Sequence, residues 1–470
     1  MRRPSFRIWL AGTLLTAGSF CYGYLAHRNS WFPAALISRA YQATQAASRD
    51  PESVPRPRGF WQPATTTVTT TERERLTEQL GTLPYLAGYE TAPPRSGVVR
   101  HDSTAAYRGL NYYTSGHSTD VILMDMEGNR LHTWHYEPED ARGGGSGSPV
   151  HSSGYLRRAL ITPDGDVLAI YDPLGDERVQ GNILVKLDRD SNVLWSYEGG
   201  IHHDFEVAND GRIYVLGRDY RSLSLQRREH PGGFLPHWPW DRLPDDKILE
   251  DFVIILSSDG EELHRVSILE AFVRSPYSAF AEQMGQLDIL HTNTLEILSD
   301  RLQPSSRAFR PGNVLISALY PSAIGILDME SEQIVWALAG PWYRQHQPTV
   351  LENGSMLLFD NHGSHGFSKV IEFNPFTLEI LWSYQGDDQN GFASPALGSA
   401  IRLRNGNTLI TESTAGRAFE VTPDNRVVWE FINPEQAGKN GELIAVIPEM
   451  VRIDPDFDLT WLPRDDTAVP

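Results

Sequence analysis

The sequence predicts an all-β fold, a six-bladed β-propeller, and two observations lead to it. Short strands are separated by Asp-Gly and Asn-Gly dipeptides, such as Asp210-Gly211 and Asn353-Gly354. These dipeptides tolerate the positive φ angles of hairpin turns. The strands recur as a unit of roughly 45 to 65 residues, a period typical of blades arranged around an axis. A two-sheet sandwich is the alternative fold, and it explains the repeat less well.

The repeating unit is clearest between residues 182 and 216, where two strands precede a histidine, a third strand, a turn and a fourth strand. Five such units and half of a sixth run from Asp120 to Asn433. We expect the segment Gly109–Tyr113 to supply the strands that the sixth unit lacks and so to close the ring. A tryptophan recurs at one position of the unit, which indicates packing between blades. These tryptophans are Trp195, Trp336, Trp382 and Trp429.

A membrane segment is expected at the N-terminus. Arg2, Arg3 and Arg7 precede an uncharged stretch, Ile8–Ala26, which is about as long as a membrane-spanning helix. Positive charge before this stretch predicts a cytoplasmic tip and a chain otherwise exposed on the periplasmic or extracellular side. A cleaved signal peptide is the competing interpretation. The expected domains are a signal-anchor (1–28), a linker (29–100), the propeller (101–455) and a C-terminal tail (456–470).

Composition excludes some functions. The net charge of -19 and the pI near 5.2 argue against nucleic-acid binding, which needs clustered Lys and Arg to neutralise phosphates. The only cysteine, Cys21, falls inside the apolar N-terminal stretch. The rest of the chain therefore has no thiol for catalysis or for a disulfide.

Three histidines occupy the same point of their repeats. His203, His291 and His346 each stand just before or at the start of the third strand of a unit. Because equivalent positions of a propeller face a common place, we expect the three imidazoles to converge near one mouth of the central channel. Asn293 follows His291 by two residues, which on a regular strand places it on the same face. Such a cluster suits either a metal or an anion.

These segments resemble the bacterial arylsulfate sulfotransferases and their shorter relatives in the arylsulfotransferase family. The resemblance extends over most of Asp120–Asn433 and is carried by four motifs. They are Ile201-His-His-Asp-Phe-Glu-Val207, Leu290-His-Thr-Asn-Thr-Leu295, Arg344-Gln-His-Gln-Pro-Thr-Val-Leu351 with Leu357-Leu-Phe-Asp-Asn361, and Gly416-Arg-Ala-Phe-Glu-Val421 with Val428-Trp-Glu-Phe431.

The resemblance implies transfer of a sulfuryl group from an aryl sulfate ester to a phenol, without the nucleotide sulfate donor and through a sulfated histidine. By this resemblance His346 is the nucleophile. His203, or His202 beside it, together with His291 and Asn293, would hold the sulfate oxygens and assist proton transfer. Imidazole and amide groups can perform this chemistry, and the resemblance implies no cofactor and no metal.

One position departs from the family pattern. The family places an arginine in the strand after the His-x-Asn element, and this chain has Leu319 there, next to Tyr320. Arg344, two residues before His346, is the expected substitute if the strand is regular. The alternative function is a non-catalytic, membrane-anchored propeller that binds a ligand or a protein partner. No recurring cofactor signature supports a third class, the quinone-dependent dehydrogenases.

Two further segments carry expectations. Asp360-Asn361-His362 with His365 is interpreted as a polar loop after a strand, in preference to a second metal site. The insertion from Tyr220 to Asp245, which contains Trp238 and Trp240, is long enough to cover a channel mouth as a lid or a docking surface.

Overall fold

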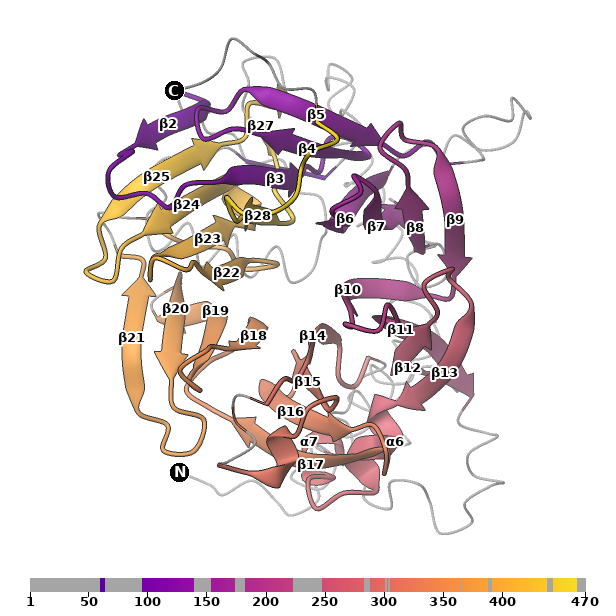
Figure 1. The fold of residues 1–470 in the computed structure, drawn as a ribbon. Helices are drawn as coiled ribbons and strands as arrows, with labels where there is room; N and C mark the ends of the chain where they lie inside the picture. Colours follow the sequence, from indigo (N-terminus) through magenta and orange to yellow (C-terminus); the bar gives the residue numbers. More distant parts are fainter. Residues whose placement is uncertain are drawn as a thin grey trace, which may run out of the picture. The chain divides into compact units, whose positions relative to one another are not determined.

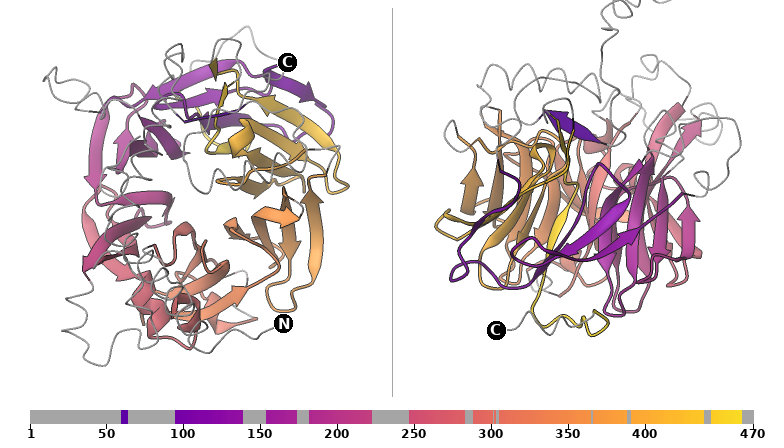
Figure 2. Two further views of the ribbon diagram at one scale, coloured as in Figure 1. Left: turned by 180° about the vertical axis from the view of Figure 1, so that it is seen from behind. Right: turned by 90° about the horizontal axis from the view of Figure 1, so that it is seen from above.

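The fold is a ring of sheets. The computed structural model describes residues 60–63, 95–138, 154–173, 182–222, 247–282, 288–300, 302, 305–364, 366–387, 391–437 and 443–462. Within the unit Pro57–Pro470, six antiparallel sheets stand around a common axis (Figure 1). Figure 2 shows the same ring from behind and edge-on. The six-bladed propeller predicted from the repeats is thereby confirmed.

Several expectations concern residues outside the described ranges. They are the Ile8–Ala26 stretch with Cys21, Trp238 and Trp240 of the insertion, His365, and residues 463–470. In the part of the chain that the structure describes, no helix is long and apolar enough to cross a membrane. The signal-anchor therefore stays a prediction.

Blades 2 to 5 each use four consecutive strands, which run in order from the inside of the ring to the outside. Blade 2 contains β6 (Gly154–Ile161), β7 (Val167–Pro173), β8 (Ile183–Leu187) and β9 (Val193–Glu198). Blade 3 contains β10 (Ile201–Val207), β11 (Ile213–Ser222), β12 (Lys247–Leu256) and β13 (Glu262–Ser267). Blade 4 contains β14 (Thr292–Ile297), β15 (Val314–Ala318), β16 (Ala323–Asp328) and β17 (Gln333–Ala339). Blade 5 contains β18 (His346–Val350), β19 (Met356–Ser364), β20 (Phe367–Phe373) and β21 (Ile380–Gln385).

The ring closes between blades 6 and 1, in a different way from the one predicted. Blade 6 is complete, with β22 (Ser399–Arg402), β23 (Thr408–Glu412), β24 (Arg417–Val421) and β25 (Val427–Ile432), and β2 (Gly97–His101) adds a fifth, outer strand. The segment expected to complete it forms most of β3 (Leu110–Thr114), which belongs to blade 1 with β4 (Asp120–Met124) and β5 (Arg130–His135). The inner strand of blade 1 is β28 (Met450–Ile453).

The prediction about the closing strands was wrong because the repeating unit in the sequence begins in the middle of a blade, two strands away from the blade boundary. Residues 182–216 form the two outer strands of blade 2 and the two inner strands of blade 3. The connection between these blades, Gly199–Gly200, is as short as a hairpin loop. The sequence therefore does not distinguish a turn within a blade from a crossing to the next blade.

A small sheet and several short helices lie outside the six blades. A three-stranded sheet contains β1 (Trp61–Pro63), β27 (Leu443–Ala445) and β26 (Gln436–Ala437). Short helices are α6 (Ile268–Val273), α7 (Ala279–Glu282), η2 (Arg307–Phe309) and η3 (Ser413–Ala415). The Ser267 hydroxyl caps α6 by accepting a hydrogen bond from the Glu270 N–H.

The hydrophobic core is divided among the six spaces between neighbouring blades. Successive residues of the inner-middle strands point to opposite faces, so each strand feeds two of these spaces. In β15, Val314 and Ile316 pack toward blade 3, whereas Leu315 packs toward blade 5. Both faces of a blade are therefore covered, and every residue of β15 is buried.

The recurring tryptophans pack between blades, as predicted. The Trp429 indole N–H donates to the Met126 carbonyl of blade 1 over 2.9 Å, and Trp382 donates to Pro423 of blade 6 over 3.0 Å. Trp195 packs on Gly260 of blade 3, where an added Cβ would lie 2.6 Å from the ring. Trp336 packs against the hydrophobic cluster between blades 4 and 5.

Candidate active site

The inner strands of four neighbouring blades leave regular pairing close to their first residues. These register shifts lie between Leu156 and Arg158 in β6, Ile201 and Phe205 in β10, Thr292 and Thr294 in β14, and His346 and Thr349 in β18. A bulge bends its strand and re-aims the side chains beside it. His203, His291 and Gln347 have φ angles of 59°, 50° and 45°, a region that non-glycine residues usually avoid. The local backbone thus directs these side chains differently from the alternating side chains of a regular strand.

The bulged strand ends surround a cavity, here called the central cavity, of about 420 Å³ with its open mouth included. Every blade, or the segment directly before its inner strand, contributes to the lining. One contributor from each of blades 1 to 6 is, in order, Glu449, Arg158, Asp204, Thr294, Gln347 and Ser399.

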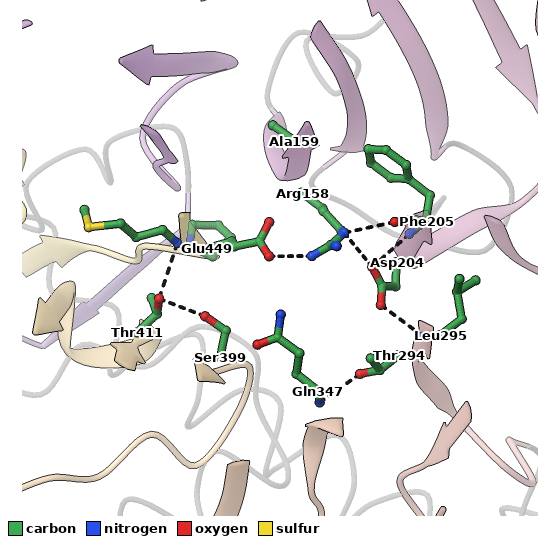
Figure 3. A network of polar contacts seen from close by, with 12 residues as sticks. Arg158, Ala159, Asp204, Phe205, Thr294, Leu295, Gln347, Ser399, Thr411 and Glu449 are labelled. Carbon is green, nitrogen blue, oxygen red and sulfur yellow. Dashed lines mark hydrogen bonds and ion pairs between the residues drawn. The ribbon is translucent and has the colours of Figure 1, made fainter. Parts of the chain in front are cut away.

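Those six residues belong to a belt of polar contacts that joins the inner strands (Figure 3). The Arg158 guanidinium lies between two carboxylates, pairing with Asp204 (Nε–Oδ1 2.5 Å) and with Glu449. Asp204 also accepts from the Leu295 N–H of the next blade over 3.0 Å. Thr294 accepts from the Gln347 N–H over 2.9 Å, and the Gln347 side chain accepts from the Ala400 N–H over 2.9 Å. These bonds join the inner strands of blades 2 to 6 in turn, tie blade 2 to the residue before β28, and so fix the cavity wall.

His346 lines the central cavity with only 9% of its surface exposed. Its Nδ1 lies 2.7 Å from Oδ1 of Asn361 and 3.3 Å from the carbonyl oxygen of Arg344, two residues earlier in the chain. The pKa of His346 is lowered to about 4, and burial is the main cause. The nearby His291 and Arg157 act in the same direction, whereas the hydrogen bond to Asn361 opposes them. The imidazole is therefore neutral near pH 7.

His202 and His203 form a pair on β10. Their Nδ1 atoms are 2.8 Å apart, so one ring donates a hydrogen bond to the other. Burial holds the pKa of both well below the usual value, with Arg218 acting on His202 and Arg157 on His203 in the same direction. His203 lines the central cavity, whereas His202 lies behind it with Nε2 3.6 Å from Asp251.

His291 completes the histidine cluster. Its ring centroid lies 4.9 Å from that of His203 and 5.2 Å from that of Tyr320. On the other side, its Nδ1 is 2.5 Å from the carboxylate of Asp288. A carboxylate that accepts from Nδ1–H leaves Nε2 of the same ring able to exchange a proton. This arrangement is typical of a histidine that acts as a general acid or base.

Asn293 and Arg157 also line the central cavity. The Asn293 amide donates to the Gln345 carbonyl over 2.8 Å, which ties blade 4 to blade 5 at this point. Arg157 sits at the bulge of β6, where Nε and Nη2 both donate to Asp172 over 2.9 and 2.7 Å. Its Nη1 takes no part in those bonds, and its charge acts on both His203 and His346.

The geometry brings five of the six predicted residues together, by direct ring contact or in the cavity wall: His346, His291, His203, His202 and Asn293. The same-face argument for Asn293 does not hold, because β14 begins after His291 and the bulge interrupts the alternation. Their individual roles stay predictions.

Arg344 is placed differently. It precedes β18, has a φ of 56°, and its guanidinium lies over the Tyr343 ring at 5.7 Å. It does not belong to the cavity wall. Leu319, at the position where the family carries arginine, is buried, and its N–H donates to the His291 carbonyl over 3.3 Å.

Sequence reasoning missed Arg157 and Asn361. Arg157 lies in a strand without a histidine motif, and its only signal is its position at the start of an inner strand. The sequence predicts a polar loop at Asp360, Asn361 and His362, but all three lie in β19, which continues to Ser364. The pairing of β19 with β20 is interrupted between Asp360 and Ser364, and this irregularity explains why the segment resembles a loop.

Among the described residues, no three His, Cys, Asp or Glu side chains are grouped as metal ligands would be. The wall of the central cavity is instead made of imidazoles, amides and guanidinium groups balanced by carboxylates. These groups suit the binding and transfer of an anion.

The arylsulfotransferase family, described as Arylsulfotransferase (ASST), matches residues 178–434, which is more than half of the chain. The chain belongs to this family. The match contains all four motifs and every predicted site residue, and it supports a transferase that acts on small aryl substrates.

Among curated proteins, none matches this arylsulfotransferase-family chain. Similar solved structures include a protein of unknown function from Bacteroides caccae, 12% identical with a TM-score of 0.44, where the alignment covers 72% of this chain and 99% of the other. A streptogramin B lyase is 12% identical with a TM-score of 0.39, covering 78% and 98%. The Cps50 (Swd1) propeller domain of Myceliophteria thermophila is 10% identical with a TM-score of 0.41, covering 76% and 100%.

Proposed function

We propose that this family member moves a sulfuryl group from an aryl sulfate ester to a phenolic acceptor by a ping-pong route, with His346 as the nucleophile. The observation that carries the proposal is a buried His346 in the same cavity wall as His203, Asn293 and Arg157. Burial lowers the pKa of His346, which keeps the ring neutral near pH 7. A neutral imidazole has the lone pair that nucleophilic attack requires.

In the first half-reaction, a ring nitrogen of His346 attacks the sulfur of the donor. An N–S bond forms while the S–O bond to the aryl group breaks, and the electron pair leaves on the phenolate oxygen. His291, oriented by Asp288, gives that oxygen a proton. In the second half-reaction, the acceptor phenol returns a proton to His291 and its oxygen attacks sulfur. The N–S bond breaks and its electron pair returns to His346.

Positive charge for the sulfate oxygens comes from Arg157 in this proposal. Arg157 lines the cavity and acts electrostatically on His346, so a group bonded to that histidine lies within reach of the same charge. The amide of Asn293 and the ring of His203 supply further donors in the cavity wall. Arg157 would thereby supply the positive charge that Leu319 lacks.

The location of the reaction belongs to the same proposal. Arg2, Arg3 and Arg7 before the apolar Ile8–Ala26 favour a single anchoring helix, with the propeller on the periplasmic or extracellular side. Fusing a reporter enzyme to each end of the chain would test this orientation.

The activity is tested by following transfer from 4-nitrophenyl sulfate to phenol with the full-length protein, while varying both substrates. We expect turnover that requires phenol, parallel double-reciprocal plots, and loss of transfer in His346→Asn. A matched control is His264→Asn, because His264 is half-exposed on the outer strand β13 and pairs with Glu332. Absence of transfer from several aryl sulfates by folded protein would contradict the proposal and favour the ligand-binding propeller.

A further inference from the structure

Two acceptors surround the same nitrogen of His346. Nδ1 faces Oδ1 of Asn361 at 2.7 Å and the Arg344 carbonyl oxygen at 3.3 Å. The Arg344 carbonyl oxygen only accepts hydrogen bonds, so it favours a proton on Nδ1. The contact with Asn361 favours the same tautomer only if Oδ1 of the amide, and not Nδ2, faces the ring.

The Asn361 amide has one satisfactory orientation. Its Nδ2 donates to the carbonyl oxygens of Ser394 (2.7 Å) and Leu397 (2.5 Å), in the segment between blades 5 and 6. Reversing the amide would place Oδ1 against two carbonyl oxygens and lose both bonds. Asn361 is only 2% exposed, so no solvent would replace these bonds. Oδ1 therefore faces His346 and accepts.

We propose that Asn361 is a positioning residue that keeps the proton of His346 on Nδ1, so that Nε2 carries the lone pair that accepts the sulfuryl group. The sulfuryl step rests on the proposed function, whereas the tautomer does not. When Nε2 bonds to sulfur the ring becomes positively charged, and the Nδ1–H bond to Asn361 strengthens with that charge. Asn361 thus assists both formation and departure of the N–S bond.

The structure explains why an asparagine on β19 can reach this ring. His346 pairs with Phe359, the regular pairing of β19 with β20 ends at Asp360, and it resumes at Ser364. Asn361 is the first residue in that interruption, and the Ser368 hydroxyl donates to its carbonyl over 2.9 Å. Its side chain is thereby directed between His346 and the Ser394–Leu397 segment.

The test is nitrogen NMR of full-length protein labelled at the histidine ring nitrogens, with the His346 signals assigned by their loss in His346→Gln. We expect a protonated Nδ1 and an unprotonated Nε2 near neutral pH. A wild-type ring protonated at Nε2 would overturn the proposal, and this measurement requires no variant of Asn361 and no activity.

The second measurement compares Asn361→Ala with wild type. We expect a mixture of tautomers and a fall in kcat on the order of 10- to 100-fold, with KM changed less than about 3-fold. The matched control is Asn433→Ala, because Asn433 is fully buried and its amide donates to Ser115 and Ala445. Unchanged tautomer and kcat in Asn361→Ala would overturn the proposal, as would an equal fall in both variants. Wild-type protein that carries the Nδ1 proton yet transfers no sulfuryl group would support the tautomer and contradict the proposed function.

Discussion

Burial of His346 links the chemistry of one residue to the stability of the fold. The folded protein holds the pKa of this imidazole at about 4, below its usual value of 6.5. As pH falls, the unfolded chain therefore takes up a proton before the folded protein does. The stabilisation from keeping this ring neutral is fully present above the unfolded pKa and is lost as pH falls from 6.5 toward 4.

A pH series isolates this effect. Between about pH 7 and about pH 5, we expect the free energy of unfolding of wild type to fall by about 2 kcal/mol more than that of His346→Gln. Buried carboxylates such as Asp251 and Glu206 titrate in both proteins and cancel in the comparison. Urea unfolding at each pH gives the values. An equal fall in the free energy of unfolding with pH in the two proteins would show that burial does not lower the pKa of His346.

Arg157 is the residue on which anion binding depends in this account. We expect Arg157→Met to lower kcat/KM for an aryl sulfate by about 100- to 1000-fold, and Arg157→Lys to lower it less, since lysine keeps the charge but loses the two-pronged geometry. Arg189→Met is the control, because Arg189 is an exposed arginine of the same blade. Folding of each variant is checked by circular dichroism, since Asp172 loses its charged partner in Arg157→Met. Full activity of folded Arg157→Met would remove Arg157 from the site.

At the scale of elements, the histidines could be predicted and their partners could not. His203, His291 and His346 repeat at equivalent positions, so the fold alone brings them to one end of the inner strands. Arg157 and Asn361 have no counterpart in such a pattern, and each depends on an irregularity that alternation along a strand does not foresee. Bulges at the starts of β6, β10, β14 and β18 decide which side chains reach the cavity.

The recurring tryptophans contribute unequally to the packing between blades. Trp429 is fully buried and donates to the Met126 carbonyl, whereas Trp336 at the equivalent position of blade 4 is only half-buried. We expect Trp429→Phe to lower the free energy of unfolding by about 2 kcal/mol, since the carbonyl loses its donor and a gap remains. Trp336→Phe should cost less than half as much. Equal losses in urea unfolding would show that the inter-blade hydrogen bond contributes nothing.

At the scale of the whole molecule, the closure of the ring was the part of the fold that the sequence did not reveal. The repeats predicted six blades, but β28 contains no repeat motif and pairs with β3, which lies more than three hundred residues earlier. A buried ion pair supports this closure: Arg452 of β28 binds Glu420 of blade 6 at 3.0 Å, and both side chains are 0% exposed. Arg452 also donates to Asn111 of β3 over 2.6 Å.

Breaking this pair should loosen the ring. We expect Arg452→Met to lower the free energy of unfolding by about 3–5 kcal/mol, because Glu420 is left buried without its counter-charge. Adding Glu420→Gln should recover part of the loss. The exposed pair Arg404–Asp456 is the control, and Arg404→Met should cost less than about 1 kcal/mol. A small loss in Arg452→Met would show that the strand pairing alone holds the ring closed.

The central claim is that His346 carries the sulfuryl group between the two half-reactions. Full-length protein is mixed with 4-nitrophenyl sulfate in the absence of phenol, quenched under alkaline conditions, digested and examined by mass spectrometry. The account predicts the added mass of one SO₃ group on the peptide containing His346, its removal by phenol, and its absence from His346→Asn. Transfer to phenol with no adduct on His346, or with the adduct on another residue, would contradict the account.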